Sequence, residues 1–260
     1  MSDILSRAAP PPDVTVRYGD LPEHVIDLRL PAVTPAPLIV LIHGGFWRPE
    51  YDRTHLRPMA NALAACGYVV AMPEYRRAGM APDWRGTFDD IANALDAIAG
   101  RAEPHGADPR RVTWAGHSAG GHLALWAAAR PHLTADSPWR GRCDAQHVVS
   151  LAGCNSLSLT AAWNLGDGAA QNLLGGTPAD HPDRYALTDP AVLTSPSVPV
   201  TLVHGTADDR VPVQMSRVTR AGRLVEIDGA DHFDLIDPHS RHWPRVLAAI
   251  TAYPADHDLA

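Results

Sequence analysis

Short apolar runs alternate with helical patterns along most of this chain of 260 residues. The runs PLIVLIH (Pro37–His43) and YVVAMP (Tyr68–Pro73) are almost entirely apolar, as expected of strands that are covered on both faces. Further strands are predicted at 24–30, 111–116, 146–153, 198–205 and 223–228. Helical spacing is found at 53–65, at 87–99 with Thr87 as its N-cap, at 119–130 and from 240 onward. This alternation predicts an α/β fold, in which helices cover both faces of a mostly parallel sheet.

The chain is expected to form a single domain over residues 1–260. Residues 1–13, which include the run AAPPP, are predicted to form a loose N-terminal lead-in. Residues 155–196 contain loops and short helical pieces but no clear strand. Because an insertion of this length interrupts a regular α/β pattern, we expect it to form a small cap or lid.

Composition excludes several classes of partner. The formal net charge is −7 and the chain contains no lysine, which argues against binding to nucleic acid or to an anionic membrane surface. The three cysteines are widely spaced and suggest free thiols in a reducing compartment. No segment has the apolar core of a signal peptide, and no apolar run approaches a membrane span of about 20 residues. We therefore expect a cytoplasmic protein, either a monomer or a homodimer.

The segment GHSAG, residues 116–120, carries the strongest chemical signal. It fits the pattern G-x-S-x-G and stands where a predicted strand turns directly into a predicted helix. A serine on such a tight turn needs very small neighbours, and Gly116 and Gly120 meet that need. The turn would raise the Ser118 hydroxyl above the edge of the sheet, at the N-terminus of the next helix. Ser118 is therefore the predicted nucleophile.

A serine nucleophile needs a base and an acid that orients the base. In proteins with this turn the chain order is serine, acid, histidine. The segment TADDRVP follows one late strand and GADHFD follows the last one. HGTADDRVP resembles the H-G-x-x-D-x-x-V-P pattern of many α/β-hydrolases, which favours Asp208 as the acid over its neighbour Asp209. His232 is the predicted base.

A hydrolytic site of this kind also needs two N–H donors for the developing oxyanion. One is predicted to be the N–H of Ala119, directly after the serine. The other is expected from HGGFW, which follows an early strand, and Gly44 and Gly45 there allow the main chain to approach a substrate oxygen closely. We expect His43 to brace this loop.

Together, HGGFW, GHSAGGHLALWAA, HGTADDRVP and GADHF resemble the kynurenine formamidase (arylformamidase) branch of the α/β-hydrolases, close to esterases of the hormone-sensitive-lipase type. VRYGDLPEHVIDLRLP also looks like the first hairpin of that group, and LLGGTPADHPDRYALTDPAVL like its passage from cap to core. The resemblance implies an α/β-hydrolase fold and cleavage of an arylformamide such as N-formylkynurenine, or of a small ester, without a cofactor. The chain departs from such relatives at residues 154–157, where they often carry an aromatic–Asp–Leu turn.

The expected partner is a small-molecule substrate with an aromatic ring. Residues predicted to contact it are Phe46, Trp47, His117 and Trp163. No metal ligand set is expected, because His117 and His122 are five residues apart rather than four. Two alternatives remain open, namely a carboxylesterase of the same mechanism in a biosynthetic pathway, and a non-catalytic ligand-binding protein on the same fold.

Overall fold

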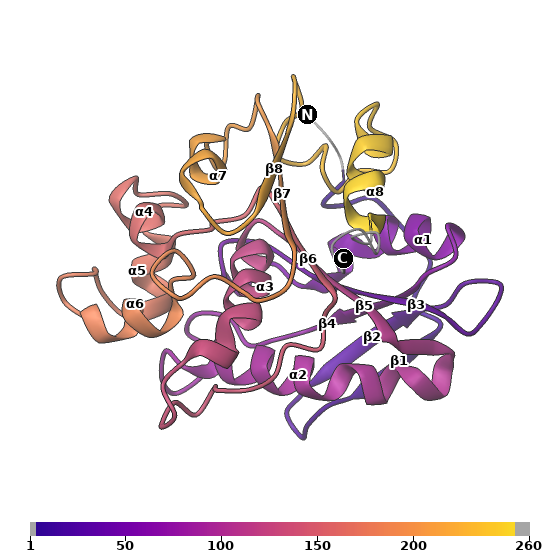
Figure 1. The fold of residues 1–260 in the computed structure, drawn as a ribbon, viewed down its shortest axis with the longest axis horizontal. Helices are drawn as coiled ribbons and strands as arrows, with labels where there is room; N and C mark the ends of the chain where they lie inside the picture. Colours follow the sequence, from indigo (N-terminus) through magenta and orange to yellow (C-terminus); the bar gives the residue numbers. More distant parts are fainter. Residues whose placement is uncertain (1–3, 253–260) are drawn as a thin grey trace, which may run out of the picture.

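The computed structural model describes residues 4–252, which are built around one sheet of eight strands (Figure 1). The strands are β1 (Val14–Arg17), β2 (Val25–Arg29), β3 (Ala36–Ile42), β4 (Val69–Pro73), β5 (Ala107–His117), β6 (His147–Leu151), β7 (Val200–Gly205) and β8 (Arg223–Ile227). Their order in the sheet is β1-β2-β4-β3-β5-β6-β7-β8. β1 pairs with β2, and β2 with β4, in antiparallel fashion, whereas every later pairing is parallel. The predicted α/β class with a mostly parallel sheet is confirmed.

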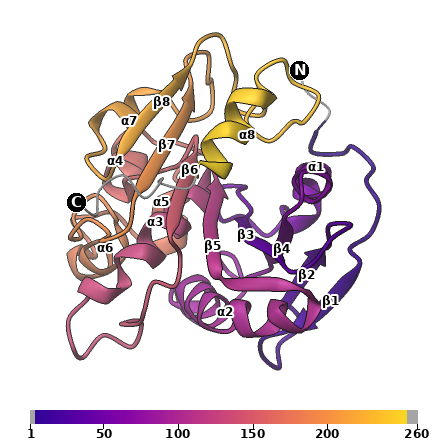
Figure 2. The same ribbon diagram turned by 45° about the vertical axis from the view of Figure 1, so that its right-hand side comes forward.

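Strand β3 shows why the sheet has helices on both faces. Its side chains alternate between two apolar clusters, because successive residues of a strand point to opposite faces. Leu38, Val40 and Ile42 pack with residues of the helices α2 (Gly86–Ala102) and α3 (Ala119–Ala129), whereas Ile39 and Leu41 pack with residues of α1 (Arg57–Ala65) and α8 (Trp243–Thr251). Figure 2 shows α1 and α8 on one side of the sheet and α2 and α3 on the other.

The main helices lie close to where the sequence predicted them. They are α1 (Arg57–Ala65), α2 (Gly86–Ala102), α3 (Ala119–Ala129) and α8 (Trp243–Thr251), whereas the short helix α7 (Gln214–Val218) was not predicted. The start of the first predicted helix, at Arg53, is instead a turn of 3-10 helix. Thr87 is not the N-cap of α2, because the helix begins one residue earlier and the Thr87 hydroxyl donates to the carbonyl of Arg76 at 2.7 Å.

Residues 155–196 contain three short helices and no strand. These are α4 (Leu157–Ala162), α5 (Ala169–Leu174) and α6 (Pro182–Thr188). The Ser156 hydroxyl accepts a hydrogen bond from the N–H of Leu159 and so caps α4. Figure 1 shows the three helices grouped together at one side of the molecule.

The described part of the N-terminal segment is attached to the domain, which differs from the predicted loose lead-in. Ile4 is fully buried in the same cluster as Ile236. The Arg7 guanidinium donates two hydrogen bonds to the Asp237 carboxylate, at 2.5 and 2.9 Å. These contacts join residues 230 positions apart and leave no local periodicity in the sequence, so pattern reasoning could not find them. Residues 1–3 of the predicted lead-in lie outside the described residues.

The parallel strands end at one edge of the sheet. The residues predicted to take part in catalysis lie in the segments that follow these strand ends. His43 follows β3, Ser118 follows β5, Asp208 follows β7 and His232 follows β8. In open parallel sheets this carboxyl edge is where binding sites form. Within residues 4–252, no helix is both long enough and apolar enough to cross a membrane.

Candidate active site

Ser118 stands on a strained turn between β5 and α3. Its backbone angles are φ 57° and ψ −119°, a region that residues with a side chain rarely adopt. The flanking glycines make the turn possible. A Cβ on Gly116 would lie 2.0 Å from the carbonyl oxygen of Gly120, and one on Gly120 would lie 2.1 Å from that of Ile42. The N–H of Ser118 also donates to the carbonyl of Leu151 at 2.8 Å, which ties the turn to β6.

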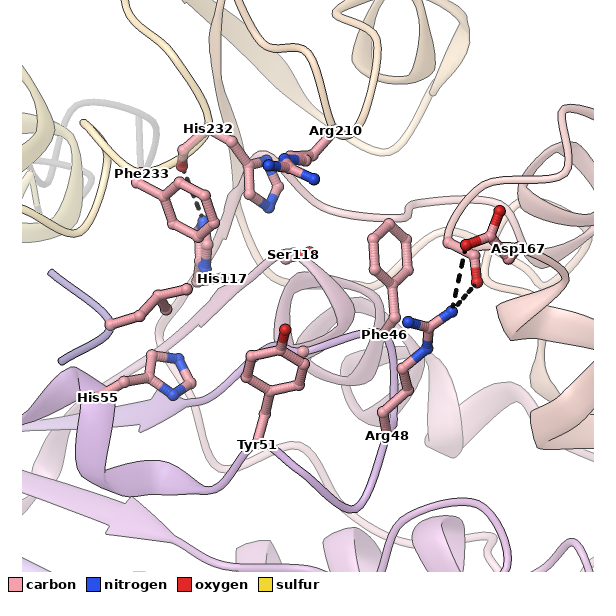
Figure 3. Close-up of a pocket in the computed structure, with 13 residues that line it drawn as sticks. Phe46, Arg48, Tyr51, His55, His117, Ser118, Asp167, Arg210, His232 and Phe233 are labelled. Carbon is pink, nitrogen blue, oxygen red and sulfur yellow. Dashed lines mark hydrogen bonds and ion pairs between the residues drawn. The ribbon is translucent and has the colours of Figure 1, made fainter. Parts of the chain in front are cut away.

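A cavity of about 280 Å³ opens above this turn (Figure 3). Ser118, His117 and His232 lie on its wall, together with Gly45 of the HGGFW loop. The remaining lining residues are Leu5, Phe46, Arg48, Tyr51, His55, Gly166, Asp167, Arg210 and Phe233. The predicted nucleophile and the predicted base therefore face the same space.

Asp208, rather than Asp209, is the carboxylate next to His232. Nδ1 of His232 lies 2.7 Å from Oδ2 of Asp208, whereas the Asp209 side chain is 75% exposed and lies beside Arg210. The other oxygen of Asp208 accepts hydrogen bonds from the N–H groups of Arg210 and Val211, at 2.9 and 2.8 Å. Burial alone would raise the pKa of Asp208, but hydrogen bonds from His204 and His232 hold it well below its usual value. The carboxylate is thus ionised over the whole neutral range.

A buried chain of hydrogen bonds supports Asp208. No local sequence pattern reveals this chain, because it joins residues from separate segments. Nε2 of His204 lies 3.3 Å from Asp208, and Nδ1 of His204 lies 2.7 Å from the Ser216 hydroxyl. Asn155 donates to the same hydroxyl at 3.2 Å and accepts from Ser150 at 2.7 Å. Asn155 belongs to residues 154–157, where the sequence differs from the family that it resembles. A residue of this differing segment therefore helps to support the acid.

His117 positions the main chain of the predicted base. Its ring lies against that of His232, with 4.6 Å between the centroids. Nε2 of His117 lies 3.0 Å from the carbonyl oxygen of His232, and since a carbonyl can only accept, this nitrogen carries a hydrogen. Burial, reinforced by the nearby His232, lowers the pKa of His117 well below its usual value. His117 is therefore a neutral ring that holds His232 in place and lines the cavity.

The two glycines of HGGFW are required for different structural reasons. A Cβ on Gly44 would lie 2.7 Å from the carbonyl of His117 and 2.9 Å from Cβ of Ser118, so Gly44 allows this loop to touch the serine turn. Gly45 has φ 109° and lines the cavity. Phe46 and Trp47 also have positive φ, at 49° and 53°. Three consecutive residues with positive φ form a tight coil, and this coil brings main-chain groups to the cavity.

His43 is buried beneath this coil and joins it to the end of β4. Its Nδ1 lies 2.8 Å from the carbonyl of Gly44, and its Nε2 lies 3.0 Å from the Glu74 carboxylate. Both ring nitrogens therefore face oxygen atoms of the protein. The Tyr75 ring stacks on His43 with 4.3 Å between centroids, and the Tyr75 hydroxyl donates to the His43 carbonyl at 2.8 Å.

Glu74 is the charged centre of this arrangement, and sequence reasoning passed over it. Besides His43, its carboxylate accepts from the side chains of Arg53 and Arg77 and from the N–H of Tyr75. Burial alone would raise its pKa, but the hydrogen bond and charge of His43, together with Arg77, lower the pKa of Glu74 to about 2. The only available signal was a charged residue directly after the apolar strand YVVAMP.

The four residues predicted to contact substrate have separate outcomes. Phe46 and His117 line the cavity. Trp47 does not, because it is fully buried and packs edge-on against the ring of His122, with 5.2 Å between the centroids. Trp163 ends α4, is about one-third exposed and is not among the lining residues. The structure therefore does not support substrate contact for either tryptophan.

The predicted oxyanion donors lie where the turn and the loop meet. Ala119 is the first residue of α3, and the N–H groups in the first turn of a helix have no partner within that helix. Gly45 reaches the cavity from the other side, whereas Gly44 packs beneath it. Among residues 4–252, no cluster of three or more His, Cys, Asp or Glu side chains is arranged to hold a metal ion.

Comparison with models of known protein families identifies the family to which the chain belongs. The family model BD-FAE matches residues 26–221, which is most of the sequence. The chain belongs to the BD-FAE family. The matched range contains Ser118 and Asp208 but ends before His232.

Several curated proteins that are similar to this chain are named as esterases. Esterase LipC of Mycobacterium tuberculosis is 27% identical over 244 residues, which cover 85% of this chain and 60% of LipC. The isoprenylcysteine alpha-carbonyl methylesterase ICME of Arabidopsis thaliana is 25% identical, over 85% of this chain and 56% of ICME. The chain thus spans little more than half the length of these relatives.

Solved structures confirm the α/β-hydrolase fold of this BD-FAE member. Esterase B from Lactobacillus Rhamnosis aligns with a TM-score of 0.72 at 21% identity, covering 92% of this chain and 84% of its own. A putative thioesterase from Silicibacter sp. aligns with a TM-score of 0.69 at 25% identity, covering 92% of this chain and 86% of its own.

The contacts of His43 predict that it acts as a brace for the oxyanion loop. In the variant His43→Ala we expect kcat to fall by about 10²-fold, because the Gly45 main chain would lose its fixed position. Circular dichroism should show that the fold is kept. The matched control is His132→Ala, at an exposed histidine away from the cavity, which should retain full activity. Unchanged turnover of His43→Ala would exclude the bracing role.

Proposed function

We propose that this protein is a serine hydrolase of the carboxylesterase type that acts on a small aromatic substrate. The observation that carries the proposal is the 2.7 Å contact between His232 and Asp208, with His232 on the wall of the cavity that also holds Ser118. The esterase relatives support the reaction class, since hydrolysis of an ester is the activity their names state.

In the proposed reaction Ser118 attacks the substrate carbonyl while His232 accepts the hydroxyl proton. The ionised Asp208 stabilises the imidazolium that forms and holds its ring orientation. The N–H groups of Ala119 and Gly45 stabilise the negative charge on the former carbonyl oxygen. His232 then gives its proton to the leaving alcohol or amine. Water, activated by the same histidine, releases the acyl group from Ser118.

The walls of the cavity favour a flat aromatic group on the substrate. Phe46, Tyr51 and Phe233 present aromatic rings around the space above Ser118 (Figure 3). Aromatic rings pack well against one another in offset or edge-on arrangements. This feature also keeps an arylformamide, such as N-formylkynurenine, as the second candidate substrate, in agreement with the resemblance of the four sequence motifs. Both candidates use the same chemistry and differ in the leaving group and the acyl group.

The choice of acid predicts a clear difference between two neighbouring aspartates. Asp208→Asn should lower kcat by about 10³- to 10⁴-fold, because an amide cannot stabilise the imidazolium and favours the wrong tautomer of His232. Asp209→Asn makes the same chemical change one residue away, at an exposed side chain, and should keep at least half of the activity. The two rates would be measured with 4-nitrophenyl acetate. Equal losses in both variants would contradict the assignment of Asp208.

A substrate comparison tests the proposed function itself. Turnover of 4-nitrophenyl acetate and of N-formylkynurenine would be measured side by side with the wild type and with Ser118→Ala. We expect ester hydrolysis that Ser118→Ala abolishes. Deformylation at a comparable kcat/KM would assign the formamidase activity, and ester hydrolysis alone would assign the carboxylesterase. Binding of both compounds without any turnover would instead indicate a ligand-binding protein and overturn the proposal.

A further inference from the structure

The cavity contains two guanidinium groups that the proposed reaction does not use. Arg48 comes from the loop after β3, and Arg210 comes from the loop that follows β7. Figure 3 shows the end of Arg210 beside His232 and that of Arg48 beside Phe46, so both cations border the space above Ser118. Transfer of an acyl group to serine needs a base, an acid and N–H donors, but no fixed cation. These arginines therefore call for a separate explanation.

Main-chain hydrogen bonds fix the backbone positions of Arg48 and Arg210. The N–H of Arg210 donates to Asp208 at 2.9 Å, so the residue is held by the same loop that presents the acid. The N–H of Arg48 donates to the carbonyl of Gly45 at 2.9 Å, and its guanidinium donates to the carbonyl of Gly166. The main chain of each arginine is thus part of a loop that borders the reacting centre, and the Arg48 guanidinium also contacts the segment 155–196.

The acidic partners of the two arginines leave them able to bind an anion. Asp167 lies 3.9 Å from Arg48 and is almost fully exposed, and Asp209 lies 3.5 Å from Arg210 and is also mostly exposed. Pairs of this length in contact with water are weak and screened by salt. The side chains of Arg48 and Arg210 are themselves only 38% and 50% exposed, so a ligand in the cavity would meet them partly out of water.

The other groups that face the cavity do not cancel this positive charge. Asp167 is the one carboxylate among the lining residues, against two arginines. Burial, with the nearby His43, lowers the pKa of His55 to about 4, so His55 is neutral, as is His117. A guanidinium binds a carboxylate through charge-assisted hydrogen bonds, often two at once.

We propose that Arg48 and Arg210 bind a carboxylate on the non-reacting part of the substrate, so that the preferred substrate is a small aromatic monoanion rather than a neutral ester. The inference rests on the proposed function, because it concerns the substrate of the same site. The rings of Phe46, Tyr51 and Phe233 hold the aromatic part, and the arginines select the charged part. Neutral esters remain substrates, but poorer ones.

The test compares a free acid with its own methyl ester. The two pairs are 3-acetoxybenzoate with methyl 3-acetoxybenzoate, which carry the charge on the leaving group, and mono-4-nitrophenyl adipate with its methyl ester, which carry it on the acyl group. The quantity measured is the ratio of kcat/KM for the acid to kcat/KM for the ester, after subtraction of the rate without enzyme. We expect this ratio to be at least 10 in one pair and to decrease as salt concentration increases.

Variants then assign the effect to the arginines. Arg210→Gln and Arg48→Gln should each lower the favourable ratio about tenfold, mainly through KM of the acid. Differences in intrinsic reactivity between acid and ester cancel, because the same two compounds are used with every variant. The matched control is Arg110→Gln, which removes the same charge from an 86% exposed side chain near the start of β5, at the opposite end of that strand from Ser118. It should leave the ratio unchanged.

The possible outcomes separate this inference from the proposed function. Hydrolysis of the neutral esters with acid-to-ester ratios near or below 1 in both pairs would overturn the inference and leave the hydrolase intact. A high ratio that Arg210→Gln and Arg48→Gln do not reduce would also overturn it. Absence of any hydrolysis, with all four compounds, would overturn the proposed function and the inference together.

Discussion

The close contact of three main-chain segments beneath Ser118 is the constraint on which the rest of the site depends. Gly116 touches Gly120 within the turn, Gly120 touches the end of β3, and Gly44 touches the turn from the neighbouring loop. No side chain larger than hydrogen fits at these points. The strain of Ser118, of about 1–3 kcal/mol, is tolerated because packing on all sides leaves the turn no alternative. The same contacts bring the serine, the helix N-terminus and the HGGFW loop into one place.

Buried polar groups, rather than apolar packing alone, hold the loops around this turn. Glu74 and His43 anchor the HGGFW loop to β4, and a hydrogen-bonded chain through His204 supports the loop that carries Asp208. In a low-dielectric interior such groups are strongly held when fully paired and costly when one partner is removed. The loops are therefore kept in one arrangement, as a site that must place reacting atoms accurately requires.

The sequence predicted those parts that local patterns encode. Alternation of apolar runs located the sheet, and the small residues around Ser118 located its turn, because both follow from steric rules within a few residues. Patterns could not locate the pairing of Arg7 with Asp237 or of Glu74 with His43, since these join distant segments. Trp47 was misassigned because its position in the HGGFW loop does not reveal the direction of its side chain. The structure directs it into the core, against His122.

We propose that Ser118 is a nucleophile activated by the groups that gather at the carboxyl edge of the sheet. A fluorophosphonate reacts covalently with a serine hydroxyl that a neighbouring base activates. The most direct measurement is therefore mass spectrometry of this protein after reaction with a fluorophosphonate. We expect a single phosphonyl group on the peptide that contains Ser118, and we expect this label to be lost in His232→Ala. A label on another residue, or a folded protein that takes up no label, would contradict it.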